Sequence, residues 1–159
     1  MPSSAIVRAL LLVLLAASLS AFAQGQKCTD ATTQLNAAGL FKIRLRNVEY
    51  LRSECTTFFP EKTHDFAALV TAWQAADAVP IAKTEELWPK LLAREPKVEA
   101  AVTRVTNATA FSIALMKELE PNGERTLLLE FCVRQIADGT SAAWRTRTPE
   151  IYRLLEEQE

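Results

Sequence analysis

Glycine is scarce in this sequence, with four residues in 159, and the seven prolines are spread along the chain. A phosphate-binding loop needs several closely spaced glycines, and none of the four provides that pattern. The sequence also lacks the dense turn residues of a β-sandwich and contains no internal repeat or low-complexity segment. These absences exclude several common nucleotide-binding and all-β classes.

Histidine is almost missing as well, because His64 is the only one and lies in a polar stretch, EKTHD. A catalytic thiol needs a neighbouring base, usually histidine, and a group that orients it. The cysteines, Cys28, Cys55 and Cys132, show no C-x-x-C spacing, so a zinc site is not indicated either. We therefore expect no catalytic residue, no metal site and no cofactor, and an enzyme is the less favoured class.

Neither sign of charge is in excess. The chain has 18 basic and 19 acidic residues, a net charge of −1. A nucleic-acid-binding protein displaces counterions with an excess of lysine and arginine, which this chain does not have. We expect no nucleic-acid partner.

The N-terminus has the layout of a secretory signal peptide. Arg8 precedes the uncharged run ALLLVLLAASLSAF, and Ala21-Phe22-Ala23 places small residues where a signal peptidase reads them. The run is short for a membrane span, which needs about 20 apolar residues. We expect cleavage after Ala23, export to the periplasm or beyond, and no stable membrane anchor. Residues 24–159 then form one domain, with residues 24–39 as a poorly ordered N-terminal segment.

The remaining pattern predicts an all-α domain of five or six helices. Apolar residues from Phe41 to Cys55 recur with helical spacing, and further helices are bounded by prolines and turn signals. The segment Asp138-Gly139 is expected to close one helix, with glycine in a left-handed conformation.

The segment 96–119 is expected to be the long central helix of this bundle. Between Ala100 and Met116 its only charged residue is Arg104, whereas a surface helix normally keeps one charged face. The alternative is that its second face is an exposed patch that binds a partner.

Two of the three cysteines are expected to pair in an oxidising compartment. A Cys55–Cys132 bond closes a loop of 77 residues (132 − 55), worth roughly 4.5 kcal/mol in the chain-entropy model. A Cys28–Cys55 bond gives roughly 3.5 kcal/mol, so energy alone does not choose. Placement favours Cys55–Cys132, because both lie on apolar helical stripes, while Cys28 stays open as a partner of either.

Two groups of residues are candidates for binding. Trp144, Arg145 and Arg147 combine residue types that are favoured as interface anchors; the alternative is that Trp144 folds back over the end of the bundle. Arg44, Arg46 and Arg52 make the first helix basic and could bind a small anion if they turn inward. The alternative for these three is a solvated face opposite the apolar stripe.

The arrangement of Cys55, Phe58-Phe59-Pro60, Trp73, Cys132 and Trp144 through Pro149 resembles that of small helical periplasmic proteins of Gram-negative bacteria. Most of these have no assigned role, and some are immunity-protein-like. The resemblance implies an exported, non-enzymatic binding or inhibitor protein that contacts another periplasmic or secreted protein. The second hypothesis is a small-anion-binding helical bundle or helical enzyme that uses the arginines of the first helix.

Overall fold

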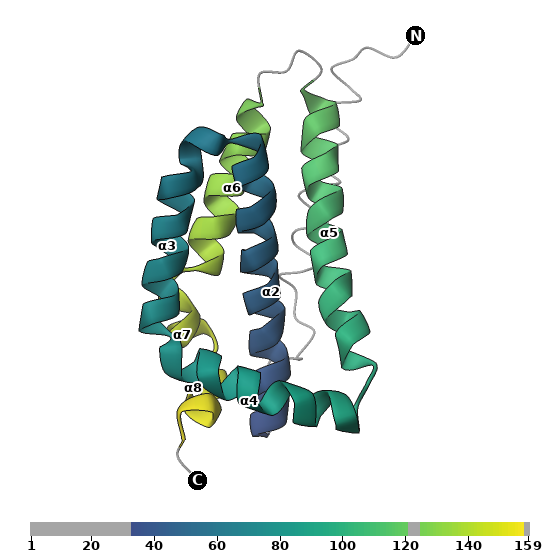
Figure 1. Cartoon of the computed structure of the whole chain (residues 1–159), viewed down its shortest axis with the longest axis vertical. Helices are drawn as coiled ribbons and strands as arrows, with labels where there is room; N and C mark the ends of the chain where they lie inside the picture. The colour runs from purple at the N-terminus through teal and green to yellow at the C-terminus, as the bar shows by residue number, and fades with distance from the viewer. Residues whose placement is uncertain (1–32, 121–124, 158–159) are drawn as a thin grey trace. The chain divides into compact units, whose positions relative to one another are not determined.

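The computed structural model describes residues 33–120 and 125–157, and every regular element in these ranges is helical (Figure 1). The predicted all-α class is confirmed. The described ranges contain seven α-helices rather than five or six, because the C-terminal segment folds as two short ones. They are α2 (Gln34–Phe58), α3 (Thr63–Ala76), α4 (Ala78–Arg94), α5 (Val98–Leu119), α6 (Thr126–Gly139), α7 (Ala143–Arg147) and α8 (Pro149–Glu156), with a 3-10 turn η1 (Pro60–Lys62) between α2 and α3.

The predicted signal peptide, residues 1–23, and Cys28 lie outside the described residues. Within the described ranges, no helix combines the length and apolar character needed to cross a membrane.

The helix α2 lies at the centre of the domain and contacts α3, α4, α5, α6 and α8. Its predicted apolar stripe is buried, from Phe41 through Leu45 and Val48 to Cys55. The helix begins earlier than its apolar pattern indicates, because the Thr33 side chain caps it by accepting from the Asn36 N–H at 3.2 Å. The prediction of a poorly ordered segment was wrong for residues 34–39, where Ala37 and Ala38 are fully buried in the core. Residues 24–32 of that segment lie outside the described residues.

The helix α5 is an edge helix, so the prediction that segment 96–119 is central was wrong. Its buried residues are Val102 and Ile113, and Phe111 is 70% exposed. The scarcity of charge between Ala100 and Met116 did not indicate burial, because α5 exposes small and hydroxylated residues to solvent. The hydroxyls of Thr103 and Ser112, for example, bond to carbonyls of their own helix at 3.0 Å.

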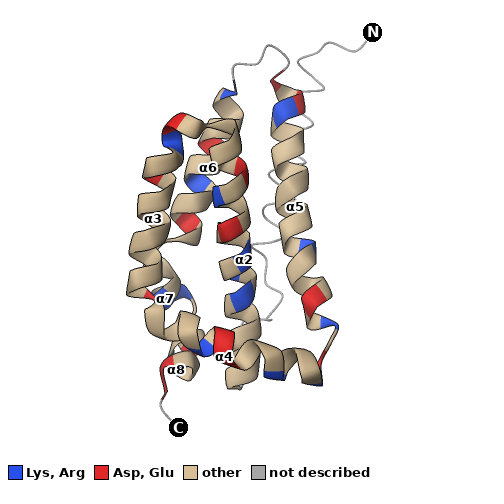
Figure 2. Ribbon diagram, viewed as in Figure 1, with Lys and Arg blue, Asp and Glu red and all other residues tan. Residues whose placement is uncertain are grey.

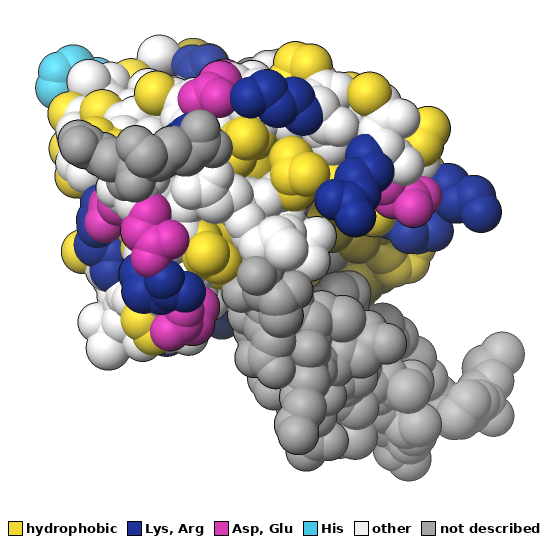
Figure 3. Space-filling model, turned by 90° about the horizontal axis from the view of Figure 1, so that it is seen from below, with side chains coloured by type: hydrophobic (Ala, Val, Ile, Leu, Met, Phe, Trp, Pro, Cys, Tyr) yellow, Lys and Arg dark blue, Asp and Glu magenta, His cyan; other side chains and the backbone are white. Residues whose placement is uncertain are grey.

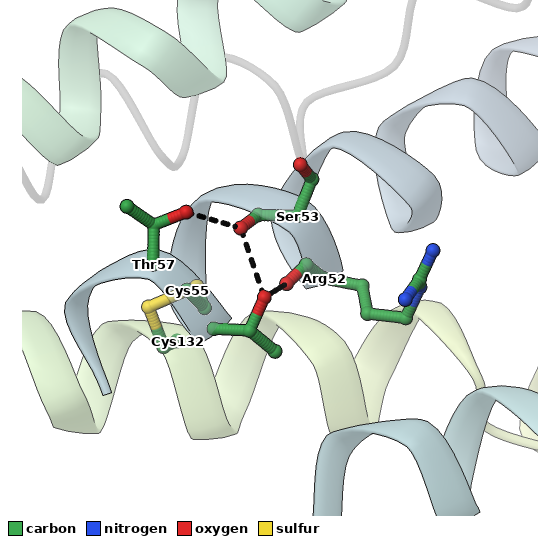
Figure 4. Close-up of a disulfide and its surroundings, with 6 residues drawn as sticks. Arg52, Ser53, Cys55, Thr57 and Cys132 are labelled. Carbon is green, nitrogen blue, oxygen red and sulfur yellow. Dashed lines mark hydrogen bonds between the residues drawn. A yellow bond between two sulfur atoms is a disulfide. The ribbon is translucent and has the colours of Figure 1, made fainter. Parts of the chain in front are cut away.

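A disulfide joins Cys55 of α2 to Cys132 of α6, which confirms the predicted pairing (Figure 4). The two Cα atoms are 5.9 Å apart and both residues are fully buried. The bond fixes the late helix against the central one, as expected from the apolar stripes of the two helices. Such a bond is consistent with an oxidising compartment.

Gly139 is the last residue of α6, but it is not left-handed as the sequence suggested. It is required for a different reason: a Cβ added there would lie 2.7 Å from Cγ2 of Val48. The missing side chain lets the end of α6 approach α2 closely, and the Gly139 carbonyl accepts a hydrogen bond from Arg44 at 2.7 Å.

Candidate functional site

Two charged side chains are buried where α2 meets the α3–α4 junction and the C-terminal helices. Arg44 is 8% exposed and Asp77 is 4% exposed, and they form an ion pair at 3.4 Å between Nη1 and Oδ2. We call the surrounding group the Arg44–Asp77 cluster; its members are Arg44, Trp73, Asp77, Trp144, Arg145 and Tyr152. Burying an unpaired charge costs free energy, so paired buried charges indicate either a functional site or an interaction that holds helices together.

Asp77 is placed by the junction between two helices, since its backbone closes α3 and begins α4. Its Oδ2 accepts from Trp73 Nε1 at 2.7 Å and from the Tyr152 hydroxyl at 2.8 Å. Its Oδ1 accepts from Arg145 Nη2 at 3.0 Å. The carboxylate therefore joins α3, α7 and α8 at one point.

The Arg44 guanidinium enters the same region from α2. Its Nε donates to the Gly139 carbonyl at 2.7 Å, its Nη2 donates to the Ser141 carbonyl at 3.3 Å, and its Nη1 donates to the Tyr152 hydroxyl. Its Cζ lies 4.8 Å from the centre of the Trp73 ring and 5.1 Å from that of Trp144. Arg44 is thus enclosed by carbonyls, aromatic rings and a carboxylate of its own chain.

Two groups of the cluster, the Tyr152 hydroxyl and the Arg44 guanidinium, stay protonated at neutral pH. Burial, together with the hydrogen bond to Asp77, raises the pKa of the Tyr152 hydroxyl to about 12, so this group stays protonated. Burial lowers the pKa of the Arg44 guanidinium, but Tyr152 and Asp77 oppose that change. An arginine remains cationic under these conditions. The cluster can hold helices together and can orient side chains at its edge.

The structure brings the predicted partner-binding residues together at that edge. Arg147 lies over Trp144, with 4.7 Å from its Cζ to the ring centre, and Arg145 lies 4.4 Å from the centre of the Tyr152 ring. The side chains of Arg145 and Arg147 are 40% and 47% exposed. We call Trp144, Arg145 and Arg147 the α7 patch.

Trp144 is half-buried and packs against the main core. Its Nε1 donates to the Asp138 carbonyl at 2.8 Å. The ring therefore folds back over the end of the domain, as the alternative interpretation expected. It still supports Arg147 on its outer side.

The predicted anion-binding arginines do not share a site. The Arg44 guanidinium is occupied inside the cluster, whereas Arg46 and Arg52 are exposed. Arg46 lines an open depression of about 250 Å³ between α2 and α5, next to Glu49 and Glu99. Arg52 lines another of about 310 Å³ between α2 and α3, which Glu49 also borders.

Two central members of the cluster, Asp77 and Tyr152, were missed by sequence reasoning. They lie 75 residues apart in the chain, so no local pattern connects them. A partial signal was the four-residue spacing of Trp73 and Asp77, which places an indole N–H and a carboxylate on one helical face.

In residues 33–120 and 125–157, no three histidine, cysteine, aspartate or glutamate side chains gather as a metal site would require. The single histidine, His64, is exposed at the start of α3.

Comparison with known proteins gives no match: no family model, no curated protein and no solved structure is similar enough to this chain to be informative. The resemblance to small helical periplasmic proteins therefore stays a prediction. The candidate site is defined by its geometry alone.

Proposed function

We propose that this protein is an exported, non-enzymatic binding or inhibitor protein that contacts another periplasmic or secreted protein through the α7 patch. The observation that carries the proposal is the pair of half-exposed arginines, Arg145 and Arg147, held over aromatic rings on a buried support. The disulfide is consistent with the proposed compartment.

Ion pairs within the chain restrict both arginine side chains before a partner binds. Arg145 donates to buried Asp77 at 3.0 Å and to Glu156 at 2.7 Å. Arg147 donates to Asp138 at 2.9 Å, and the carbonyl of the same Asp138 fixes the indole beneath it. Restricting a long side chain in advance reduces the entropy that binding must remove.

The partner expected from this chemistry presents carboxylates to the guanidinium groups. Seen from the end formed by α4 and α8, basic and acidic side chains lie beside one another and among apolar ones (Figure 3). On such a mixed surface the overall charge does not select a partner, so recognition depends on local geometry.

The test compares Arg147→Glu with Arg153→Glu, a matched control on α8. Arg153 is 53% exposed and also pairs with carboxylates, Glu150 and Glu157, but it lies outside the α7 patch. A partner captured by the wild-type protein from a periplasmic extract is purified and titrated calorimetrically. We expect R147E to lose at least about tenfold in affinity, about 1.4 kcal/mol, and R153E to bind like wild type.

Equal binding by R147E and wild type would remove the α7 patch from the interface. Failure to recover a stoichiometric partner, combined with a small anion that raises the melting temperature, would favour the small-anion hypothesis instead.

A further inference from the structure

The outer face of α5 lies on the other side of α2 from the α7 patch (Figure 1). Phe111 is 70% exposed at its centre, and Ala108 and Ala114 beside it are also exposed. Figure 2 shows that the middle turns of α5 carry no charged side chain, while charges lie toward both ends. An uncharged, exposed helix face with a central aromatic residue is a candidate interface.

The charged residues that border this face are placed symmetrically. Arg104 and Glu118 each lie seven residues from Phe111, on opposite sides, and both are exposed. At 1.5 Å per residue, each lies about 10 Å from Phe111 along the helix axis. The steps from Arg104 to Ala108, Phe111, Leu115 and Glu118 alternate between four and three residues, which keeps them on one stripe.

The neighbouring lysine does not cancel the negative end of this stripe. Lys117 turns toward α2, where its Nζ lies 4.8 Å from the centre of the Phe58 ring. Glu118 is exposed at the next position. The stripe therefore has a positive end and a negative end, separated by uncharged turns.

We propose that this face binds the same face of a second copy, with the two α5 helices antiparallel and a two-fold axis passing beside Phe111. In this arrangement Arg104 of each copy meets Glu118 of the other, so two ion pairs form at once. The two Phe111 rings meet at the axis, and Ala108 faces Ala114 of the second copy, which lets the helices approach closely.

The charge pattern favours a second copy over an unrelated partner. A two-fold interface uses one surface twice, so it must be complementary to itself under reversal. A stripe with one cation and one anion at equal distances from a central apolar residue meets that condition. A single pair of helices of this length gives a small interface, and we expect a weak dimer with a micromolar dissociation constant.

The test uses charge reversal on the purified, disulfide-bonded protein in sedimentation velocity, from about 1 µM to about 500 µM, a range that covers weak interfaces. We expect the wild type to dimerise and both Arg104→Glu and Glu118→Arg to remain monomeric, because each variant opposes like charges. Mixing R104E with E118R restores both ion pairs, so an equimolar mixture should dimerise. The double variant R104E/E118R should dimerise like wild type.

Two further variants separate the apolar contribution from an effect on folding. Phe111→Ser should abolish association while leaving the circular dichroism spectrum unchanged, because the side chain is 70% exposed. Val133→Ser on α6, where the side chain is 45% exposed, is the matched control and should dimerise normally.

A wild-type protein that stays monomeric over the whole range would overturn the proposal. So would a mixture of R104E and E118R that fails to associate although wild type does, or a mixture of wild type with R104E that associates more tightly than wild type alone, which indicates parallel helices. These outcomes do not depend on Arg147, so this proposal and the proposed function fail separately.

Discussion

Replacement of Asp77 by alanine should be among the most damaging single substitutions in the domain. The change leaves the buried Arg44 guanidinium without its carboxylate. It also removes the acceptor of Trp73 Nε1 and of the Tyr152 hydroxyl. Removing one partner of a buried ion pair costs roughly 3–5 kcal/mol. Arg44 keeps two carbonyl acceptors, so we expect a loss of about 4 kcal/mol in the free energy of unfolding.

The effect should be smaller when the arginine is removed instead. In Arg44→Leu, Asp77 still accepts from Arg145, Trp73 and Tyr152, so its charge stays compensated. The double variant R44L/D77A should lose less than the sum of the two single variants, because neither buried charge is left without its partner. The control Glu156→Ala removes a half-exposed partner of Arg145 and should cost less than about 1 kcal/mol.

The assay is urea unfolding followed by circular dichroism with the disulfide intact. For a domain of this size, a loss of about 4 kcal/mol corresponds to a decrease of about 15 °C in melting temperature. A loss below about 1 kcal/mol for D77A, or strict additivity in the double variant, would refute the view that this ion pair holds the helices together.

Three further results are expected. The pKa of Tyr152 is raised to about 12 in the folded protein, whereas its value in the unfolded chain is near 10. Its contribution to the free energy of unfolding is therefore complete below about pH 10 and is lost between about pH 10 and pH 12. The stability advantage of wild type over Tyr152→Phe, measured by urea unfolding, should shrink across that range and not at lower pH. The variant C55A/C132A should lose about 3–5 kcal/mol in the free energy of unfolding. In wild-type protein that has not been reduced, alkylation in denaturant followed by mass spectrometry should find neither Cys55 nor Cys132 labelled, and labelling of both would contradict the bond. Gly139→Ala should lower the free energy of unfolding by about 1–3 kcal/mol, measured by thermal unfolding, because its Cβ would lie 2.7 Å from Val48. The loss should be smaller when Val48→Ala is also present. A G139A variant as stable as wild type would mean that α6 and α2 separate easily.

Local patterns in the sequence predicted the elements and the crosslink. The apolar spacing of α2 placed Phe41, Leu45, Val48 and Cys55 on the buried stripe, and all four are in the core. Cys132 lay on a second apolar stripe, which indicated the pairing with Cys55. The two apolar stripes were predicted correctly because each depends on residues three or four positions apart.

The same patterns failed where burial depends on distant neighbours. Between Ala100 and Met116 the only charged residue is Arg104, yet α5 lies at the edge, because uncharged threonine and alanine side chains are compatible with solvent as well as with a core. In the sequence, nothing distinguishes Arg44 from Arg46 and Arg52, which lie in the same basic stretch. Only Arg44 is buried, because carbonyls of Gly139 and Ser141 and the Tyr152 hydroxyl arrive from the other end of the chain.

Sequence patterns alone are sufficient to predict that the described chain is helical and which face of α2 is buried, and they favour Cys55–Cys132 over a bond to Cys28. Tertiary contacts were needed to show that α2 is the central helix, that Arg44 is the enclosed arginine, and that Asp77 connects α2, α3, α7 and α8. The physical reason is that helix formation and amphipathic patterning are set by neighbours along the chain. The burial of a charge depends instead on partners brought from more than thirty residues away.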